Sequence, residues 1–144
     1  MDNKVWYSIH NSRGFKQVSR ILYVQSYTIT SDILGKKVQA SIDSFNSNHD
    51  WKDMWTIEDA KERLNKGHQL FLGVDREDKP LAHVWFDKDL LYNAYVNPNR
   101  EKGYSEKFIK SCLNSIKYDK VKLYCDDWNI KAQIFFEKVG FKKI

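Results

Sequence analysis

The residues of this chain best suited to chemistry lie in one short loop, 97–105, between a strand-like run and a helix-like run. A strand that passes directly into a helix points several backbone N–H groups at one place, and the helix dipole adds to their attraction for an anion. Arg100 and Lys102 would add charge, and Gly103 would let a ligand approach the backbone closely. Ser105 would cap the helix or donate to a phosphate oxygen. The loop therefore predicts a phosphate-binding site, with an ordinary strand-to-helix turn as the alternative.

A second group of residues follows downstream, between 129 and 141. It consists of Asn129, Ala132, Phe135, Phe136, Lys138, Gly140 and Phe141. With Arg100, Gly103 and Ser105, this group resembles the two sequence patterns of the GNAT (Gcn5-related N-acetyltransferase) family, Q/R-x-x-G-x-G/A and N-x-x-A-x-x-(F/L)-Y-x-K-x-G-F. The resemblance covers about residues 20–144.

The resemblance implies an acyl-CoA site. In the family, the pyrophosphate lies on the backbone amides of the first pattern, which corresponds here to Arg100, Glu101, Lys102, Gly103, Tyr104 and Ser105. The preceding strand is splayed from its neighbour, pairs with the pantetheine arm and polarises the thioester carbonyl, and the matching residues are Ala94, Tyr95 and Val96. Asn129 matches the pantetheine-side asparagine, although capping the helix that starts at Ile130 is an equally good role. Acetyl-CoA is then the expected cosubstrate, and no metal is expected.

The match fails at the residue that often protonates the departing CoA thiolate. The family usually has tyrosine where this chain has Phe136, and a phenyl ring donates no proton. Tyr124, on the adjoining strand, and Tyr104, beside the loop, are the candidate substitutes, and each could instead be an ordinary core or surface tyrosine.

The base that deprotonates an attacking amine is equally open. The family frequently uses a glutamate on the strand before the loop, and the run Leu90–Val96 has none. His83, on the neighbouring strand, is the candidate base, with Asp89 and Asp53 as alternatives. A single histidine on a strand can also be purely structural.

Hydrophobic periodicity predicts the elements that must position these residues. A period of three to four residues indicates helices at 32–45, 57–66, about 108–116 and 130–139. Alternation and turn signals indicate strands at 5–10, 69–75, 81–86, 90–96, 121–125 and 141–144. The three strands between residues 69 and 96 have short connections and are expected to form an antiparallel meander. The segment 18–29 fits either a strand or one turn of helix.

This order of elements predicts an α/β (α+β) fold: a GNAT-like mixed, mostly antiparallel central sheet flanked by helices on both faces. We expect a single domain, 1–144, with residues 1–18 as an N-terminal extension. Only four residues follow Gly140, so the last strand of the family's sheet is expected to be missing. The N-terminal strand Val5–His10, or a segment of a second subunit in a homodimer, could cover the resulting edge.

Composition agrees with a folded protein in the cytoplasm. The chain has 144 residues, of which 42% are apolar and 30% charged, and no apolar run approaches the length of a membrane span. Cys112 and Cys125 lie in core-like segments and are expected to be free thiols. Residues 97–144 hold 11 Lys and Arg against 6 Asp and Glu, which accounts for the whole net charge of +5. CoA phosphates suit this excess better than nucleic acid does, because no nucleic-acid-binding motif accompanies the lysines.

The sequence therefore predicts an acyl-CoA-dependent N-acetyltransferase that acts on the primary amine of a small molecule or peptide. Trp51 and Trp55 fall where the family places its acceptor-binding loop, and they could equally pack beneath the first two helices. The alternative function is an acyl-CoA-binding module without catalysis, suggested by Phe136 and by the strand that lacks a carboxylate.

Overall fold

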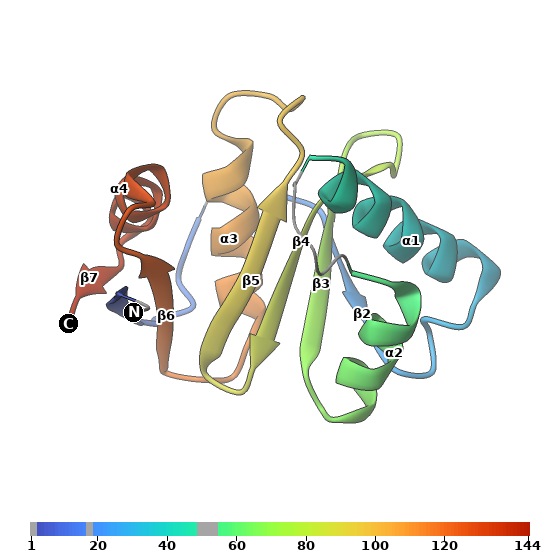
Figure 1. Cartoon of the computed structure of the whole chain (residues 1–144), viewed down its shortest axis with the longest axis horizontal. Coiled ribbons are helices and arrows are strands. Elements are labelled where there is room, and N and C mark those ends of the chain that lie inside the picture. Colours follow the sequence, from blue (N-terminus) through green and yellow to red (C-terminus); the bar gives the residue numbers. More distant parts are fainter. Residues whose placement is uncertain (1–2, 17–18, 49–54) are drawn as a thin grey trace.

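The strands of this chain form one sheet whose order differs from their order in the sequence. A computed structural model describes residues 3–16, 19–48 and 55–144, and in these ranges seven strands are arranged as β2-β3-β4-β5-β6-β1-β7. Helices α1 and α2 cover one face, and α3 and α4 lie on the other (Figure 1). The elements are β1 (Lys4–His10), β2 (Ile21–Val24), α1 (Asp32–Ser47), α2 (Ile57–Asn65), β3 (Gln69–Val74), β4 (Pro80–Asp87), β5 (Leu90–Val96), α3 (Tyr104–Ser115), β6 (Lys120–Asp126), α4 (Ile130–Val139) and β7 (Lys142–Lys143). The predicted mixed sheet with helices on both faces is confirmed.

Local signals explain why the helices begin and end where they do. Thr56 and Asp59 form a capping box at the start of α2, with each side chain accepting a hydrogen bond from the other's backbone N–H at 3.1 and 2.9 Å. Ser31 caps α1 by accepting from the N–H of Leu34. Gly140 follows α4 with a φ of +126°, a conformation that favours glycine. These signals are local, and the sequence placed α1, α2 and α4 to within two residues, whereas α3 begins at Tyr104, earlier than the predicted 108.

A hydrophobic core lies on each face of the sheet. One core packs β4, β6 and β1 against α3 and α4, and it contains the fully buried Phe108 and Leu113. The other packs α1 and α2 on β2, β3 and β4, where Trp55 stacks on Trp85 with ring centroids 5.5 Å apart. Both cysteines are free and buried, one in α3 and one in β6. Among the described residues, no helix has the length and apolarity needed to cross a membrane.

The sheet opens between β5 and β6. These two strands run parallel and share only two register pairs, Leu90 with Lys122 and Leu91 with Leu123. Every other neighbouring pair in the described sheet is antiparallel. Beyond Leu91 the two strands diverge, and no further register pair joins β5 to β6 in the described sheet.

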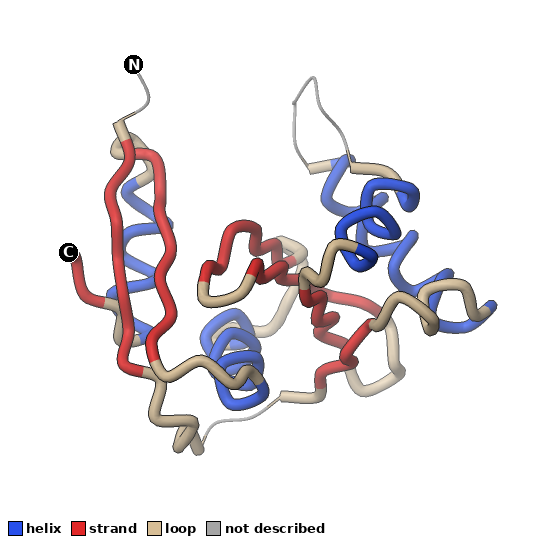
Figure 2. The backbone as a smooth tube through the Cα atoms, turned by 90° about the horizontal axis from the view of Figure 1, so that it is seen from below, coloured by secondary structure: helices blue, strands red, loops and turns tan. Residues whose placement is uncertain are grey.

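The N-terminal strand fills the place where the sequence predicts a missing strand. β1 pairs antiparallel with β6 along its whole length and with β7 on its other side. Figure 2 shows the long β1–β6 ladder at one side of the molecule with the C-terminus beside it. A strand of the same chain therefore covers this edge, and the segment of a second subunit is not needed there. Residues 4–10 are thus an internal part of the sheet, rather than an appendage to it.

Candidate functional site

The loop between β5 and α3 presents backbone donors at an open helix end. Gly103 precedes α3 with a φ of +85°, and no side chain caps the helix. Within the described residues, no acceptor pairs with the backbone N–H groups of Gly103, Ser105 or Glu106. A Cβ at position 103 would meet no atom within 4 Å. The amides therefore point into open space at the positive end of the helix dipole.

A cavity of about 390 Å³, termed here the loop cavity, lies at this helix end. It is lined by Pro98, Arg100, Glu101, Lys102, Gly103, Ser105, Glu106, Phe135 and Lys138. Its three cations face two carboxylates, and that of Glu106 is already held by Lys110 at 3.2 Å. The balance favours an anion. Tyr104 does not contribute its side chain, because its ring is buried and its hydroxyl points to the carbonyl of Val74 at 3.5 Å.

A β-bulge in β5 changes which side chains face which helices. The register with β4 shifts between Trp85 and Phe86, so Tyr92 has no direct partner. Tyr92 and Asn93 consequently both face the α1/α2 side, where their side chains bond His68 and His83. A bulge leaves one residue unpaired and bends the strand. It lies immediately beyond the point where β5 and β6 separate.

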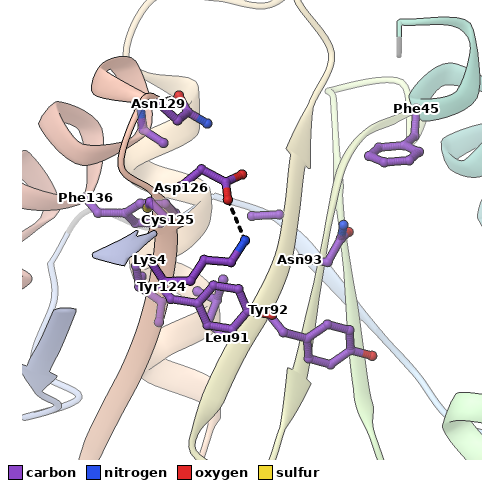
Figure 3. Close-up of a pocket in the computed structure, with 13 residues that line it drawn as sticks. Lys4, Phe45, Leu91, Tyr92, Asn93, Tyr124, Cys125, Asp126, Asn129 and Phe136 are labelled. Carbon is purple, nitrogen blue, oxygen red and sulfur yellow. Dashed lines mark hydrogen bonds and ion pairs between the residues drawn. The ribbon is translucent and has the colours of Figure 1, made fainter. Parts of the chain in front are cut away.

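A second cavity, of about 420 Å³ and termed the inter-strand cavity, lies in the gap between β5 and β6. Its lining consists of Lys4, Phe45, Leu91, Tyr92, Asn93, Ala94, Leu123, Tyr124, Cys125, Asp126, Asn129, Ala132 and Phe136. Leu123, Cys125 and Phe136 belong to the core beneath α3 and α4. Side chains alternate along a strand, so Tyr124 and Asp126 face the other side. The cavity thus passes through the sheet, with walls on both faces (Figure 3).

The structure brings three of the predicted site residues to this cavity through their side chains. Ala94, Tyr124 and Asn129 line it. Asn129 also caps α4 by accepting from the N–H of Ala132 at 3.2 Å, so the structural role that the sequence left open is present. Tyr95 and Val96 do not line it, and the Tyr95 hydroxyl is bonded to Ser44 at 2.6 Å. Both residues belong to β5, which pairs with β4 on one side and has no register pair with β6 beyond Leu91.

His83 lies beneath the cavity and does not line it. The ring is buried, with Nδ1 2.8 Å from the Ser41 hydroxyl and Nε2 3.1 Å from Oδ1 of Asn93. With a carbonyl oxygen at Nε2, that nitrogen donates, and Nδ1 accepts from Ser41. Both nitrogens are therefore engaged. His83 reaches the cavity only through Asn93, which does line it.

The wall of the inter-strand cavity on the α3/α4 side is mostly apolar. Phe136 lines the cavity at 9% exposure, and Cys125 lies next to it on the wall. Burial raises the pKa of the Cys125 thiol, with a further contribution from Asp126, so the thiol stays protonated near neutral pH. Phe136 therefore lines the cavity, but its phenyl ring has no proton to donate, so any proton transfer there must use another group.

The lining residues that were not predicted from the sequence include Lys4, Asn93 and Asp126. Asp126 ends the alternation that places Tyr124 on the open face, and this pattern could have identified it. Lys4 reaches the site only because β1 pairs with β6, and no local signal predicts that pairing. The structure shows no cluster of metal-ligating side chains among the residues it describes.

The remaining candidates lie away from the cavity or outside the described ranges. Asp89 pairs with Lys122 at 4.0 Å, near the closed end of the β5–β6 gap. Trp55 stacks on Trp85, and the Arg63 guanidinium lies 4.7 Å from the centroid of the Trp55 ring, so Trp55 packs against the core beneath α1 and α2. Asp53 and Trp51 are outside the described residues.

Known proteins resemble this chain in structure, but none was found to match it in sequence. No protein-family model and no curated protein sequence matches the chain. A GNAT-family acetyltransferase from Colwellia psychrerythraea superposes with a TM-score of 0.68 at 15% identity, over 99% of this chain and 53% of that one. An aminoglycoside acetyltransferase from an uncultured soil metagenomic sample gives 0.62 at 14% identity, over 84% and 86%. A tandem GNAT protein from the clavulanic acid biosynthesis pathway gives 0.62 at 9% identity, over 99% and 50%.

The chain spans about half the length of two of these proteins, 53% and 50%. At such identities, the likeness shows the fold and leaves the activity to be argued from the site.

Proposed function

We propose that this chain, which has the fold of the GNAT acetyltransferases, is an acyl-CoA-dependent N-acyltransferase that moves acetyl from acetyl-CoA to a primary amine. One observation carries the proposal: a cavity between two diverging strands has walls on both faces of the sheet, and α4 lines both this cavity and the one at a helix end with open amides. Such an arrangement suits a long ligand with an anionic tail and a reactive group that must meet a second molecule from the opposite face.

The residues present fit the cosubstrate. The amides of Gly103, Ser105 and Glu106 would hold the diphosphate, and Arg100, Lys102 and Lys138 would neutralise its charge. Beyond Leu91, β5 has no register pair with β6, and the backbone groups of Ala94 and Val96 on that edge would pair with the amide groups of the pantetheine arm as an added strand does. Asn129 lies along the same path, on the wall that α4 shares with both cavities.

Bound acetyl-CoA supplies an activated acyl group whose thiolate leaves readily. The chain's part is to orient this group at the bulge, where an unpaired backbone N–H of β5 would donate to its carbonyl oxygen. Holding donor and amine together can contribute roughly 7–11 kcal/mol toward the barrier, even where proton transfer is poorly assisted. Tyr124 lines the inter-strand cavity, and its hydroxyl would protonate the departing thiolate in place of the tyrosine that is missing at position 136. His83 would act by fixing the orientation of Asn93.

A specific observation favours a second function, an acyl-CoA-binding module without catalysis. On the α3/α4 side of the inter-strand cavity, Phe136 stands in place of a hydroxyl-bearing residue. This alternative predicts acetyl-CoA binding with no release of free thiol in the presence of any amine.

Calorimetric titration with acetyl-CoA, paired with thiol release across a panel of amines, tests the proposal. Gly103→Glu places a carboxylate at the helix end and should weaken acetyl-CoA binding by at least about tenfold. Gly67→Glu is the matched control, because Gly67 also has a positive φ (+94°) and open space around its Cβ, but lies after α2. The two variants share the backbone strain, so a difference between them reports the loop cavity alone. Equal acetyl-CoA affinity in both would contradict the assignment of the phosphate site.

A further inference from the structure

A lysine of the chain itself already extends into the inter-strand cavity. Lys4, on β1, lines the cavity, and its Nζ lies 2.5 Å from Oδ1 of Asp126 and 5.4 Å from the ring centroid of Tyr124. Figure 3 shows its side chain crossing in front of β6 toward the carboxylate. A carboxylate and an aromatic face are the two groups with which proteins hold an alkylammonium ion. The site therefore contains a bound primary amine that belongs to its own chain.

This amine lies on the face of the sheet opposite to the proposed acetyl-CoA site. Lys4 pairs with Asp126, and Trp6 with Tyr124, so these four side chains share one face of the β1–β6 ladder. The alternate residues Tyr7, Leu123 and Cys125 pack on the other face, in the core beneath α3 and α4. The loop cavity lies at the ends of those same two helices, at Gly103 and Lys138. An acyl group delivered from the α3/α4 side would meet the nitrogen of Lys4 from the other side of the opening.

We propose that Lys4 is an acylation site of this protein, modified by the chain's own acyl-transfer site with an acyl-CoA thioester as donor. The inference rests on the proposed function. Asp126 takes one proton from the ammonium, and the nitrogen then attacks the thioester carbonyl carbon. The new N–C bond forms as the C–S bond breaks, and the electron pair leaves on the sulfur of CoA. The second nitrogen proton goes to that thiolate, so the products are Nε-acetyl-Lys4 and free CoA.

The molecule supplies an internal control for uncatalysed acetylation. Lys122 projects from the same face of β6 and also faces an aspartate, Asp89 at 4.0 Å, but it does not line the cavity. Its side chain is 46% exposed, against 31% for Lys4. The rate of uncatalysed acetylation by acetyl-CoA from solution increases with the exposed fraction of the lysine side chain, so this reaction favours Lys122 over Lys4. Acetylation by the site reverses that order.

The experiment incubates the full chain with acetyl-CoA and follows Lys4 and Lys122 by peptide mass spectrometry, with acetyl-CoA binding measured on the same sample by calorimetry. Lys4 should gain one acetyl group about tenfold faster than Lys122 or more, at a rate per molecule that is independent of protein concentration. Asp126→Asn should slow Lys4 by about tenfold or more and leave Lys122 unchanged. Gly103→Glu should slow Lys4 in the same way, and Gly67→Glu should not.

The remaining outcomes overturn the inference in distinguishable ways. Equal rates at Lys4 and Lys122 would mean that the modification is uncatalysed. A Lys4 rate that rises with protein concentration would mean transfer between molecules. Acetyl-CoA binding without modification of Lys4, together with tighter binding by Lys4→Ala, would make Lys4 a cover over the site and would leave the proposed function intact. Absence of acetyl-CoA binding would remove both proposals.

Discussion

Replacing Gly73 by alanine tests whether close packing of α3 on β3 sets the position of the proposed phosphate-binding loop. A Cβ at position 73 would overlap the hydroxyl of Tyr104 and lie 2.7 Å from Cδ1 of Phe108, well inside normal contact distance. Both rings are buried, and Phe108 is fully so, which leaves them little room to shift. Overpacking of this kind destabilises by about 2 kcal/mol, which corresponds to a fall in Tm of roughly 5–10 °C for a domain of this size.

The effect should extend to the ligand. Tyr104 is the first residue of α3 and follows Gly103 directly, so displacing its ring moves the helix end that carries the open amides. We expect weaker acetyl-CoA binding in Gly73→Ala, measured by calorimetry, alongside a lower urea midpoint. The matched control is Gly14→Ala, whose Cβ would meet only the Ser12 hydroxyl at an ordinary 3.7 Å.

A double-mutant cycle separates overpacking from other effects. Adding Tyr104→Phe to Gly73→Ala removes the overlapping hydroxyl and should recover part of the lost stability, although the same change alone gives up a buried polar contact. If Gly73→Ala unfolds at the wild-type urea midpoint, or if Tyr104→Phe adds its own loss in full, the packing argument is refuted.

Two further predictions concern proton transfer and pH. Phe136→Tyr places a hydroxyl on the wall of the inter-strand cavity, so it should raise the rate of thiol release by about tenfold with little change in KM for acetyl-CoA. Phe135→Tyr is the control, because residue 135 lines the loop cavity, and it should leave the rate unchanged. Equal rates in the two variants would count against an acid role at position 136. Burial raises the pKa of Tyr92 and of Tyr104 to about 12, so both hold their protons more tightly in the folded chain than in the unfolded one. Their contribution to stability is complete below pH ~10 and is lost as the pH rises toward 12. Urea unfolding should therefore give a lower free energy of unfolding at pH 11 than at pH 8, and Tyr92→Phe should reduce this difference. A free energy of unfolding that is the same at both pH values would contradict the prediction.

Local signals were sufficient for most of the fold and for the loop cavity. The meander, β6 and α4 follow from alternation and helical periodicity within a few residues, and Gly103 and Gly140 have the positive φ values that their positions in the sequence suggested. The proximity of α4 to the loop, through Phe135 and Lys138, is what two motifs of one site require. These features depend on neighbours in the chain, or on one crossover between parallel strands.

The inter-strand cavity could be predicted only in part. The bulge at Tyr92 leaves no trace in the sequence, because Tyr92 and Asn93 are both acceptable on either face of a half-buried strand. The engagement of His83 depends on Ser41, which comes from α1. The ion pair of Lys4 with Asp126 depends on register between strands that are distant in sequence. Such contacts are decided by tertiary packing, which periodicity does not encode.

The pairing of β1 with β6 also constrains how the molecule can be made. Of the described strands, β1 leaves the ribosome before any other, yet Lys4 and its partner Asp126 are 122 positions apart. Val5, Tyr7 and Ile9 can pair with β6 only after residues 120–126 have been synthesised, which follow the meander in the chain. Contacts of such long range close slowly. The wall that holds the amine therefore needs residues 120–126, and a translation product that stops before residue 120 would contain the loop 97–103 but not the partner strand on which Lys4 depends.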